Sequence, residues 1–113
     1  MTIYFKNKKL SAACNSEMEA QRRFGRQNAK KILQRLSEIR ASDNLAVLSM
    51  LPSAGLHPLK GDRQGQFAVI VKQPFRIILV PQHDPVPVKD DGSIDLVKIT
   101  EICILEVVDY HGK

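Results

Sequence analysis

The spacing of apolar residues along the chain changes from a helical to a strand-like period near residue 52. A short apolar run at residues 3–5 predicts a first strand. After it, apolar or small residues recur at every fourth position, as on one face of a helix: Leu10, Cys14 and Met18. We therefore expect helix between Lys8 and Phe24. Ser16 and Glu19 match a capping box, which starts a helix, so one bent helix and two short ones both fit.

The most regular helical pattern lies between Arg26 and Ala41. Its apolar stripe consists of Ala29, Ile32, Leu33, Leu36 and Ile39. The basic residues that lie largely off this stripe are Arg26, Lys30, Lys31, Arg35 and Arg40. Gly25 supplies the break before this helix, because glycine tolerates the left-handed conformation at a helix end. Leucines at residues 45, 48 and 51 predict one or two further helical turns before Pro52.

Beyond residue 52 the apolar pattern becomes that of strands. We expect a short strand at Gly55 to Leu59 and a hairpin formed by Gln66 to Lys72 and Phe75 to Val80. The segment from Pro81 to Lys98 is polar and contains three prolines, so we expect a long surface loop there. The last strand, Ile99 to Val108, is rich in Ile, Leu and Val and should be the best-buried strand of the sheet.

The order of elements predicts an α+β fold, in which two or three N-terminal helices pack on one face of a mostly antiparallel sheet of four to five strands. We expect one domain spanning residues 1–113, because the chain is about one domain long. An alternating βαβ pattern and the glycine-rich nucleotide-binding motifs are absent, which argues against a nucleotide-binding fold.

Charge is distributed unevenly, although the net charge is only +5. Residues 1–40 carry ten Lys and Arg against three acids, whereas residues 81–113 carry three Lys against seven acids. The basic half is suited to a phosphate backbone or to an acidic protein segment, while a solvated helix face is the simpler interpretation. The N-terminus lacks the apolar core of a secretory signal, so we expect a cytoplasmic protein without a membrane span. Cys14 and Cys103 show no metal-binding spacing and are expected to be reduced and buried.

Polar residues that could carry chemistry fall in two places: residues 57–63, with His57, Lys60 and Arg63, and the terminal Asp109, Tyr110 and His111. Taken singly, either histidine is more simply a structural one. Together with Arg76, however, these groups meet the needs of RNA cleavage. A base removes the 2′-hydroxyl proton, cations stabilise the phosphorane, and an acid protonates the departing 5′-oxygen. The sequence offers no ligand set for a metal, and no cofactor is expected.

Three motifs resemble those of the HigB-type toxins in the RelE/ParE superfamily: LKGDRQGQF at 59–67, FRII at 75–78 and the terminal DYH. The resemblance implies a microbial-RNase-like fold and cleavage of mRNA in the ribosomal A site. It implies that His57 is the upstream active-site histidine and that Lys60 and Arg76 bind RNA phosphate, with Arg76 as the main stabiliser of charge. Arg63 is expected to bind RNA beside them because its side chain can supply positive charge. The resemblance further implies that Asp109 or His111 is the base and that Tyr110 orients the nucleotide.

The same resemblance implies a partner, a HigA-type helix-turn-helix antitoxin, through which alone the toxin would associate with operator DNA. The loop at residues 81–98 is longer than in compact members of the family. Two other functions stay open on this fold: a gyrase poison of the ParE kind, and a catalytically silent regulatory module. The terminal DYH favours the nuclease over the gyrase poison.

Overall fold

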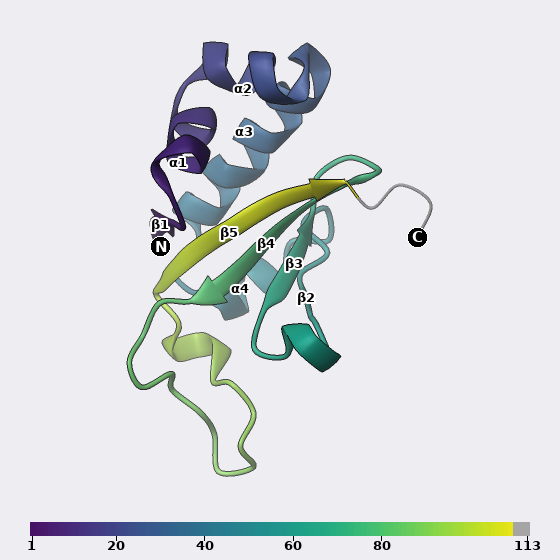
Figure 1. Cartoon of the computed structure of the whole chain (residues 1–113). Coiled ribbons are helices and arrows are strands. Elements are labelled where there is room, and N and C mark those ends of the chain that lie inside the picture. The colour runs from purple at the N-terminus through teal and green to yellow at the C-terminus, as the bar shows by residue number, and fades with distance from the viewer. Residues whose placement is uncertain (110–113) are drawn as a thin grey trace.

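In a computed structural model, which describes residues 1–109, helices pack against a five-stranded sheet (Figure 1). The elements are β1 (Thr2–Phe5), α1 (Lys8–Asn15), α2 (Glu17–Phe24), α3 (Arg26–Ala41), α4 (Leu45–Ser49), β2 (His57–Pro58), the 3-10 helix η1 (Gly61–Arg63), β3 (Phe67–Ile70), β4 (Phe75–Pro81), the 3-10 helix η2 (Leu96–Lys98) and β5 (Glu101–Asp109). The strand order is β1-β5-β4-β3-β2. Only the β1–β5 pairing among these is parallel, so the predicted α+β class with a mostly antiparallel sheet is confirmed.

The segment from Lys8 to Phe24 forms two short helices, one of the two arrangements that the sequence left open. The break falls at Ser16, whose extended backbone ends α1 and whose hydroxyl accepts a hydrogen bond from the Glu19 amide at 3.3 Å. Gly25 then separates α2 from α3 with a φ of 85°, as predicted for a helix break at glycine.

The helices pack against one face of the sheet; in the view of Figure 1, α1, α2 and α3 lie above β5 and α4 lies behind the strands. Ile32, Leu36 and Ile39 of α3 are fully or almost fully buried in the same cluster as Ile77 and Leu79 of β4. Because α3 presents this stripe along its whole length, it contributes much of the apolar area whose burial stabilises the fold.

One prediction about α3 is wrong: Arg35 is not on a solvated face. Its exposed fraction is 6%. Its Nε donates to the carbonyl of Ile70 at 2.7 Å and its Nη2 to that of Val71 at 3.3 Å, and it also pairs with Glu38. The guanidinium is tolerated inside because its donors meet acceptors there. It binds α3 to the end of β3.

The expectation that the last strand is the best buried is also wrong. Three of the four residues of β3 are buried, but only Ile102 and Ile104 of the nine residues of β5. The pairing of β4 with β5 shifts register at Ile78 and Leu79, which leaves Leu105 as an extra residue on β5. Beyond this bulge the strand is only half covered.

The strand predicted at Gly55 to Leu59 is reduced to His57–Pro58. The segment after β4, predicted to be a long polar surface loop, contains regular structure and apolar contacts. Val88 and Ile94 form an antiparallel bridge, residues 96–98 form η2, and the side chains of Val86, Ile94 and Leu96 pack against the core. Within residues 1–109, no helix combines the length and apolar character needed to cross a bilayer.

Candidate functional site

The register of the sheet places four residues in one row across four strands. His57 of β2 lies opposite Ala68, Ala68 opposite Ile78, and Ile78 opposite Glu106 of β5. Because side chains alternate between the two faces of a strand, this row lies on the face opposite to the helices. Ala68 and Ile78 are fully buried although they lie outside the main core cluster. We call this side of the sheet the open face.

His57 reaches the open face because the chain turns sharply just before it. Gly55 has a φ of 52°, and a Cβ there would come within 2.6 Å of Ile70 Cδ1, so this turn requires glycine. His57 is exposed, and its Nδ1 lies 2.9 Å from the Gly55 carbonyl oxygen. Since a carbonyl oxygen only accepts hydrogen bonds, Nδ1 is the donor in this contact. Nε2 is then the nitrogen that can exchange a proton with a substrate.

Arg63 extends across the open face from η1 to β5. Its Nη2 lies 2.6 Å from Glu106 Oε2, and its Nη1 donates to Gln66 Oε1 at 3.0 Å. η1 lies in the connection between β2 and β3, and β4 separates β3 from β5 in the sheet, so this ion pair joins two segments that are not neighbours in the sheet. Both ion-pair side chains remain about two-fifths exposed, at 40% and 41%. The guanidinium is therefore held on the open face, within reach of solvent.

Arg76 lies in the neighbouring row, between Ile70 of β3 and Val108 of β5. It is half-buried, and its Nη1 donates to the Phe75 carbonyl at 3.0 Å. The open face thus receives a second arginine, the one for which the sequence predicts a phosphate-binding role.

Asp109 is placed differently. It is exposed and lies opposite Phe75, whose ring packs against the core. Strand alternation therefore directs it to the side of the helices, whereas the preceding Val108 faces the same side as Arg76. Tyr110 and His111, the other two residues of the predicted terminal cluster, lie outside the described residues. The described structure consequently brings His57, Arg63 and Arg76 to one face but does not bring Asp109 there.

Lys60 is exposed at the start of η1 and lines a cleft of about 900 Å³. One wall of this cleft is formed by residues 58–67 and the other by residues 89–96 of the long loop. Pro58, Leu59, Ile94 and Leu96 contribute to its apolar surface, and Lys89 lines it as well as Lys60. The long loop therefore builds a cleft beside the segment that carries His57 and Arg63.

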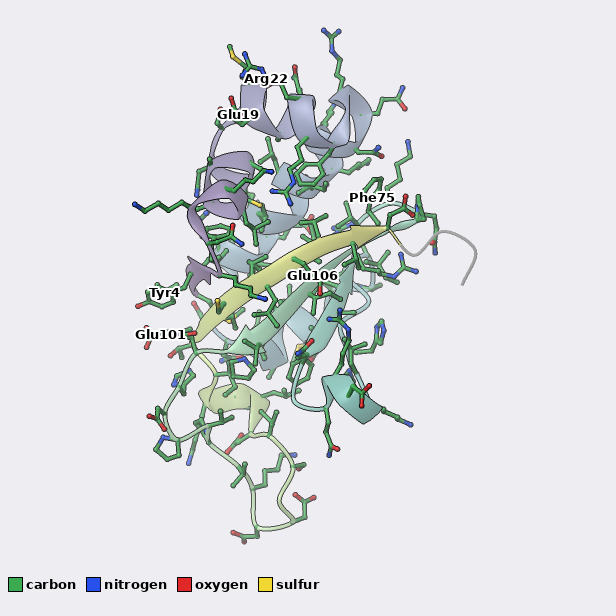
Figure 2. The ribbon with its side chains drawn as sticks, viewed as in Figure 1. Tyr4, Glu19, Arg22, Phe75, Glu101 and Glu106 are labelled. Atoms are coloured by element: carbon green, nitrogen blue, oxygen red, sulfur yellow. The ribbon has the colours of Figure 1, made fainter. Side chains whose placement is uncertain are left out.

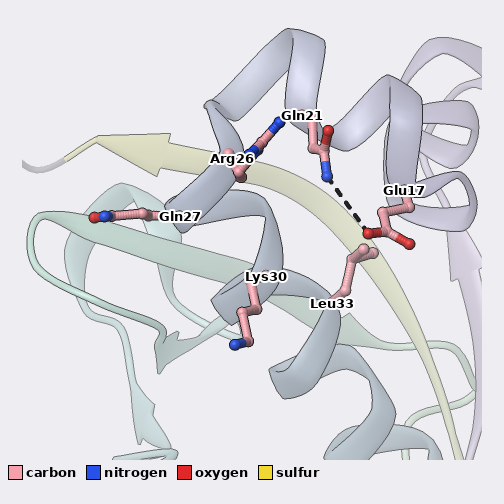
Figure 3. A pocket seen from close by; sticks show the side chains of 6 residues that line it. All are labelled: Glu17, Gln21, Arg26, Gln27, Lys30 and Leu33. Atoms are coloured by element: carbon pink, nitrogen blue, oxygen red, sulfur yellow. Dashed lines mark hydrogen bonds between the residues drawn. The ribbon is translucent and has the colours of Figure 1, made fainter.

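A second hollow, of about 700 Å³, lies between α2 and α3 (Figure 3). Arg26 and Lys30 line it together with Gln27, Leu33 and the pair formed by Gln21 and Glu17, whose side chains are 3.4 Å apart. This hollow lies in the basic N-terminal part of the chain, residues 1–40, which the charge distribution identified. Among residues 1–109, no group of three or more His, Cys, Asp and Glu side chains is arranged to hold a metal ion.

Sequence reasoning missed Glu106 and Gln66, the two residues that hold Arg63 on the open face. A signal for Glu106 was present, since it is the lone charge inside the apolar run of residues 102–108. Its pairing with Arg63 spans 43 positions of sequence and depends on the sheet register, so spacing alone could not reveal it.

Comparison with known proteins supports the fold and leaves the family undetermined. No family model matches the chain, and no curated protein gives a significant sequence match. The structure is similar to a solved structure described as a YoeB/ParE toxin from Agrobacterium tumefaciens, with a TM-score of 0.54 and 12% sequence identity. The similarity covers 98% of this chain and 100% of that chain. It shows that this chain shares the α+β fold of that protein.

Proposed function

We propose that the chain is the toxin of a type II toxin–antitoxin pair and that it cuts mRNA on the ribosome. The observation that carries the proposal is the presence of His57, Arg63 and Arg76 on the open face of one sheet. A fold shared with a protein described as a YoeB/ParE toxin supports it, and so does the order of the three HigB-like motifs.

The chemistry follows from what these groups can do to an RNA phosphate. Arg63 and Arg76 supply positive charge to the pentavalent phosphorane, whose extra negative charge is the main barrier to cleavage. His57, with Nδ1 engaged by Gly55, offers Nε2 to protonate the departing 5′-oxygen. From the sequence motifs, Asp109 or His111 is proposed as the base and Tyr110 as the residue that stacks on a nucleotide. Lys60 binds RNA phosphate at the edge of the cleft.

The proposed partners follow from the same assignment. The ribosomal A site aligns the mRNA, which a small open face does not do by itself. The basic surface of α2 and α3, with Arg26 and Lys30, suits either ribosomal phosphate or an acidic partner segment. A HigA-like antitoxin is proposed as the protein partner, and operator DNA is bound only through it. The site of action is the cytoplasm, where the ribosomes are.

The test is 5′-end mapping of a defined mRNA in a reconstituted translation reaction. Wild type is compared with His57→Ala, with Arg76→Ala, and with the double variant Asp109→Ala, His111→Ala. Lys98→Ala removes an exposed positive charge from η2 and serves as the matched control. We expect discrete A-site cuts with wild type and Lys98→Ala, and losses of at least about a hundredfold in the others. Omission of ribosomes should abolish the cuts.

Intact mRNA with folded wild-type protein would contradict the nuclease proposal. Double-strand DNA breaks on induction, without mRNA cleavage, would instead identify a gyrase poison on the same fold. Growth arrest with neither lesion would overturn both activities.

A further inference from the structure

The ion pair between Arg63 and Glu106 occupies the centre of the open face. A carboxylate and a phosphate present similar oxygen acceptors to a guanidinium. A phosphate bound by Arg63 would therefore take the place where the Glu106 carboxylate now lies, at 2.6 Å from Nη2. Glu106 would be displaced but would stay beside the bound phosphate, because β5 fixes its backbone. Figure 2 shows Glu106 in the middle part of the sheet, well away from Glu101 at the beginning of β5.

His57 lies at the other end of the same cross-strand row. Three strand spacings of about 4.8 Å put its Cα about 14 Å from that of Glu106. Both side chains project from the same face, and Arg63 reaches that face to pair with Glu106. A phosphate on Arg63 would thus have a carboxylate on one side and an imidazole on the other. In-line cleavage needs an acceptor and a donor of protons in that relation.

We infer that Glu106 is the general base of the proposed RNA cleavage, released from Arg63 when the scissile phosphate binds. Its carboxylate takes the proton of the 2′-hydroxyl, and the 2′-oxygen forms a bond to phosphorus. The bond from phosphorus to the 5′-oxygen breaks, and that oxygen receives a proton from Nε2 of a protonated His57. The products are a 2′,3′-cyclic phosphate and a free 5′-hydroxyl.

This inference rests on the proposed function, but it changes the assignment of the base from the terminal cluster to the middle of β5. Asp109 is less suited, because its strand position directs it to the side of the helices. Glu106 is directed to the face that carries His57 and Arg76.

The test measures single-turnover cleavage of mRNA in stalled ribosome complexes between pH 5 and 9. Glu106→Gln keeps an acceptor oxygen for Arg63 but cannot take a proton. Glu106→Asp keeps the carboxylate at a shorter reach. Glu101→Gln is the matched control, since Glu101 lies on the same strand and face and accepts a hydrogen bond from the Tyr4 hydroxyl at 2.8 Å. Urea midpoints and binding to the ribosome complex are measured for all four proteins.

We expect Glu106→Gln to slow cleavage at least about a hundredfold and to remove the acidic limb of the pH–rate profile, with folding and ribosome binding unchanged. Glu106→Asp should restore much of the rate together with that limb, and Glu101→Gln should behave as wild type. If Glu106→Gln keeps the acidic limb, or cleaves at the wild-type rate, Glu106 is not the base. Either result would overturn this inference and leave the proposed nuclease function standing. Wild type that never cuts would overturn this inference and the proposed function together.

Discussion

Two arginines each bind a helical segment to the sheet, one on each side, and their surroundings differ. Arg35 of α3 is 6% exposed and donates to the main-chain carbonyls of Ile70 and Val71. Arg63 of η1 is about two-fifths exposed and meets a side-chain carboxylate, that of Glu106. The first set of contacts is enclosed by protein, and the second remains within reach of a ligand.

The difference separates the structural role of Arg35 from the functional role proposed for Arg63. Removing Arg35 would leave buried carbonyl oxygens without donors, which costs far more than the bonds contribute in water. An exposed ion pair such as the one of Arg63 contributes little to stability. Its geometry suits the role proposed for Arg63, which is to hold positive charge on the open face for an anionic substrate.

The largest expected effect is on the helix-covered side. Arg35→Ala should lower the free energy of unfolding by about 3 kcal/mol, because it leaves the carbonyls at the end of β3 unsatisfied. Urea unfolding followed by circular dichroism measures this, with Lys31→Ala, an exposed position on the same helix, as the control. If Arg35→Ala lowers the free energy of unfolding no more than Lys31→Ala does, the structural role assigned to Arg35 is contradicted.

The next effect is on the open face and should appear in rate rather than in stability. Arg63→Ala should change the free energy of unfolding by less than about 1 kcal/mol. Cleavage in the translation reaction should fall by about a hundredfold, as for other lost stabilisers of transition-state charge. If Arg63→Ala instead unfolds the protein like Arg35→Ala, the contrast between the two arginines does not hold.

A smaller effect is expected where a helix end is capped on the covered side. The Asn44 side chain accepts a hydrogen bond from the Val47 amide at 3.0 Å and begins α4. Asn44→Ala should cost about 1 kcal/mol of stability without changing the rate of cleavage by the folded protein. Asn44→Asp, which keeps an acceptor oxygen, should restore most of the loss in the same urea assay.

The smallest expected effects concern the two cysteines, which differ in burial. Burial raises the pKa of Cys14 from 9.0 to about 11. The unfolded thiol loses its proton first as the pH rises, so the folded state binds more protons between about 9 and 11. Stability should therefore be full below pH 9 and fall as the pH rises above it. The unfolding free energy of wild type should fall more steeply than that of Cys14→Ala between pH 8.5 and 10.5.

Cys103 lies on the open face and is half-buried, and burial also raises its pKa. In native protein at pH 8, iodoacetamide should modify Cys103 before Cys14, because Cys14 is only 3% exposed. Mass spectrometry of partly alkylated protein measures the order. Faster modification of Cys14 would contradict its place in the helical core.

Much of the fold could be predicted from local pattern. The apolar stripe of α3, the break at Gly25 and the hairpin of β3 and β4 follow from periodicity and from the conformational freedom of glycine. Burial in the last strand was predicted less well. An apolar run indicates that a strand can be buried, but it does not indicate which of its two faces packs against other elements. Arg35 was misplaced for the same reason: helical spacing describes one helix, and its partners are 35 and 36 positions away.

The sequence by itself determined the class of fold, the order of the elements and the residue types that could cleave RNA. Those properties depend on local periodicity, turn chemistry and the presence of particular side chains. The tertiary structure decided which of those side chains share a face. The register of four strands aligned His57 with Glu106, brought Arg63 across to meet Glu106, and directed Asp109 to the other side. A shift of one residue reverses the face of every side chain in a strand, so only the pairing itself could settle which residues share the open face.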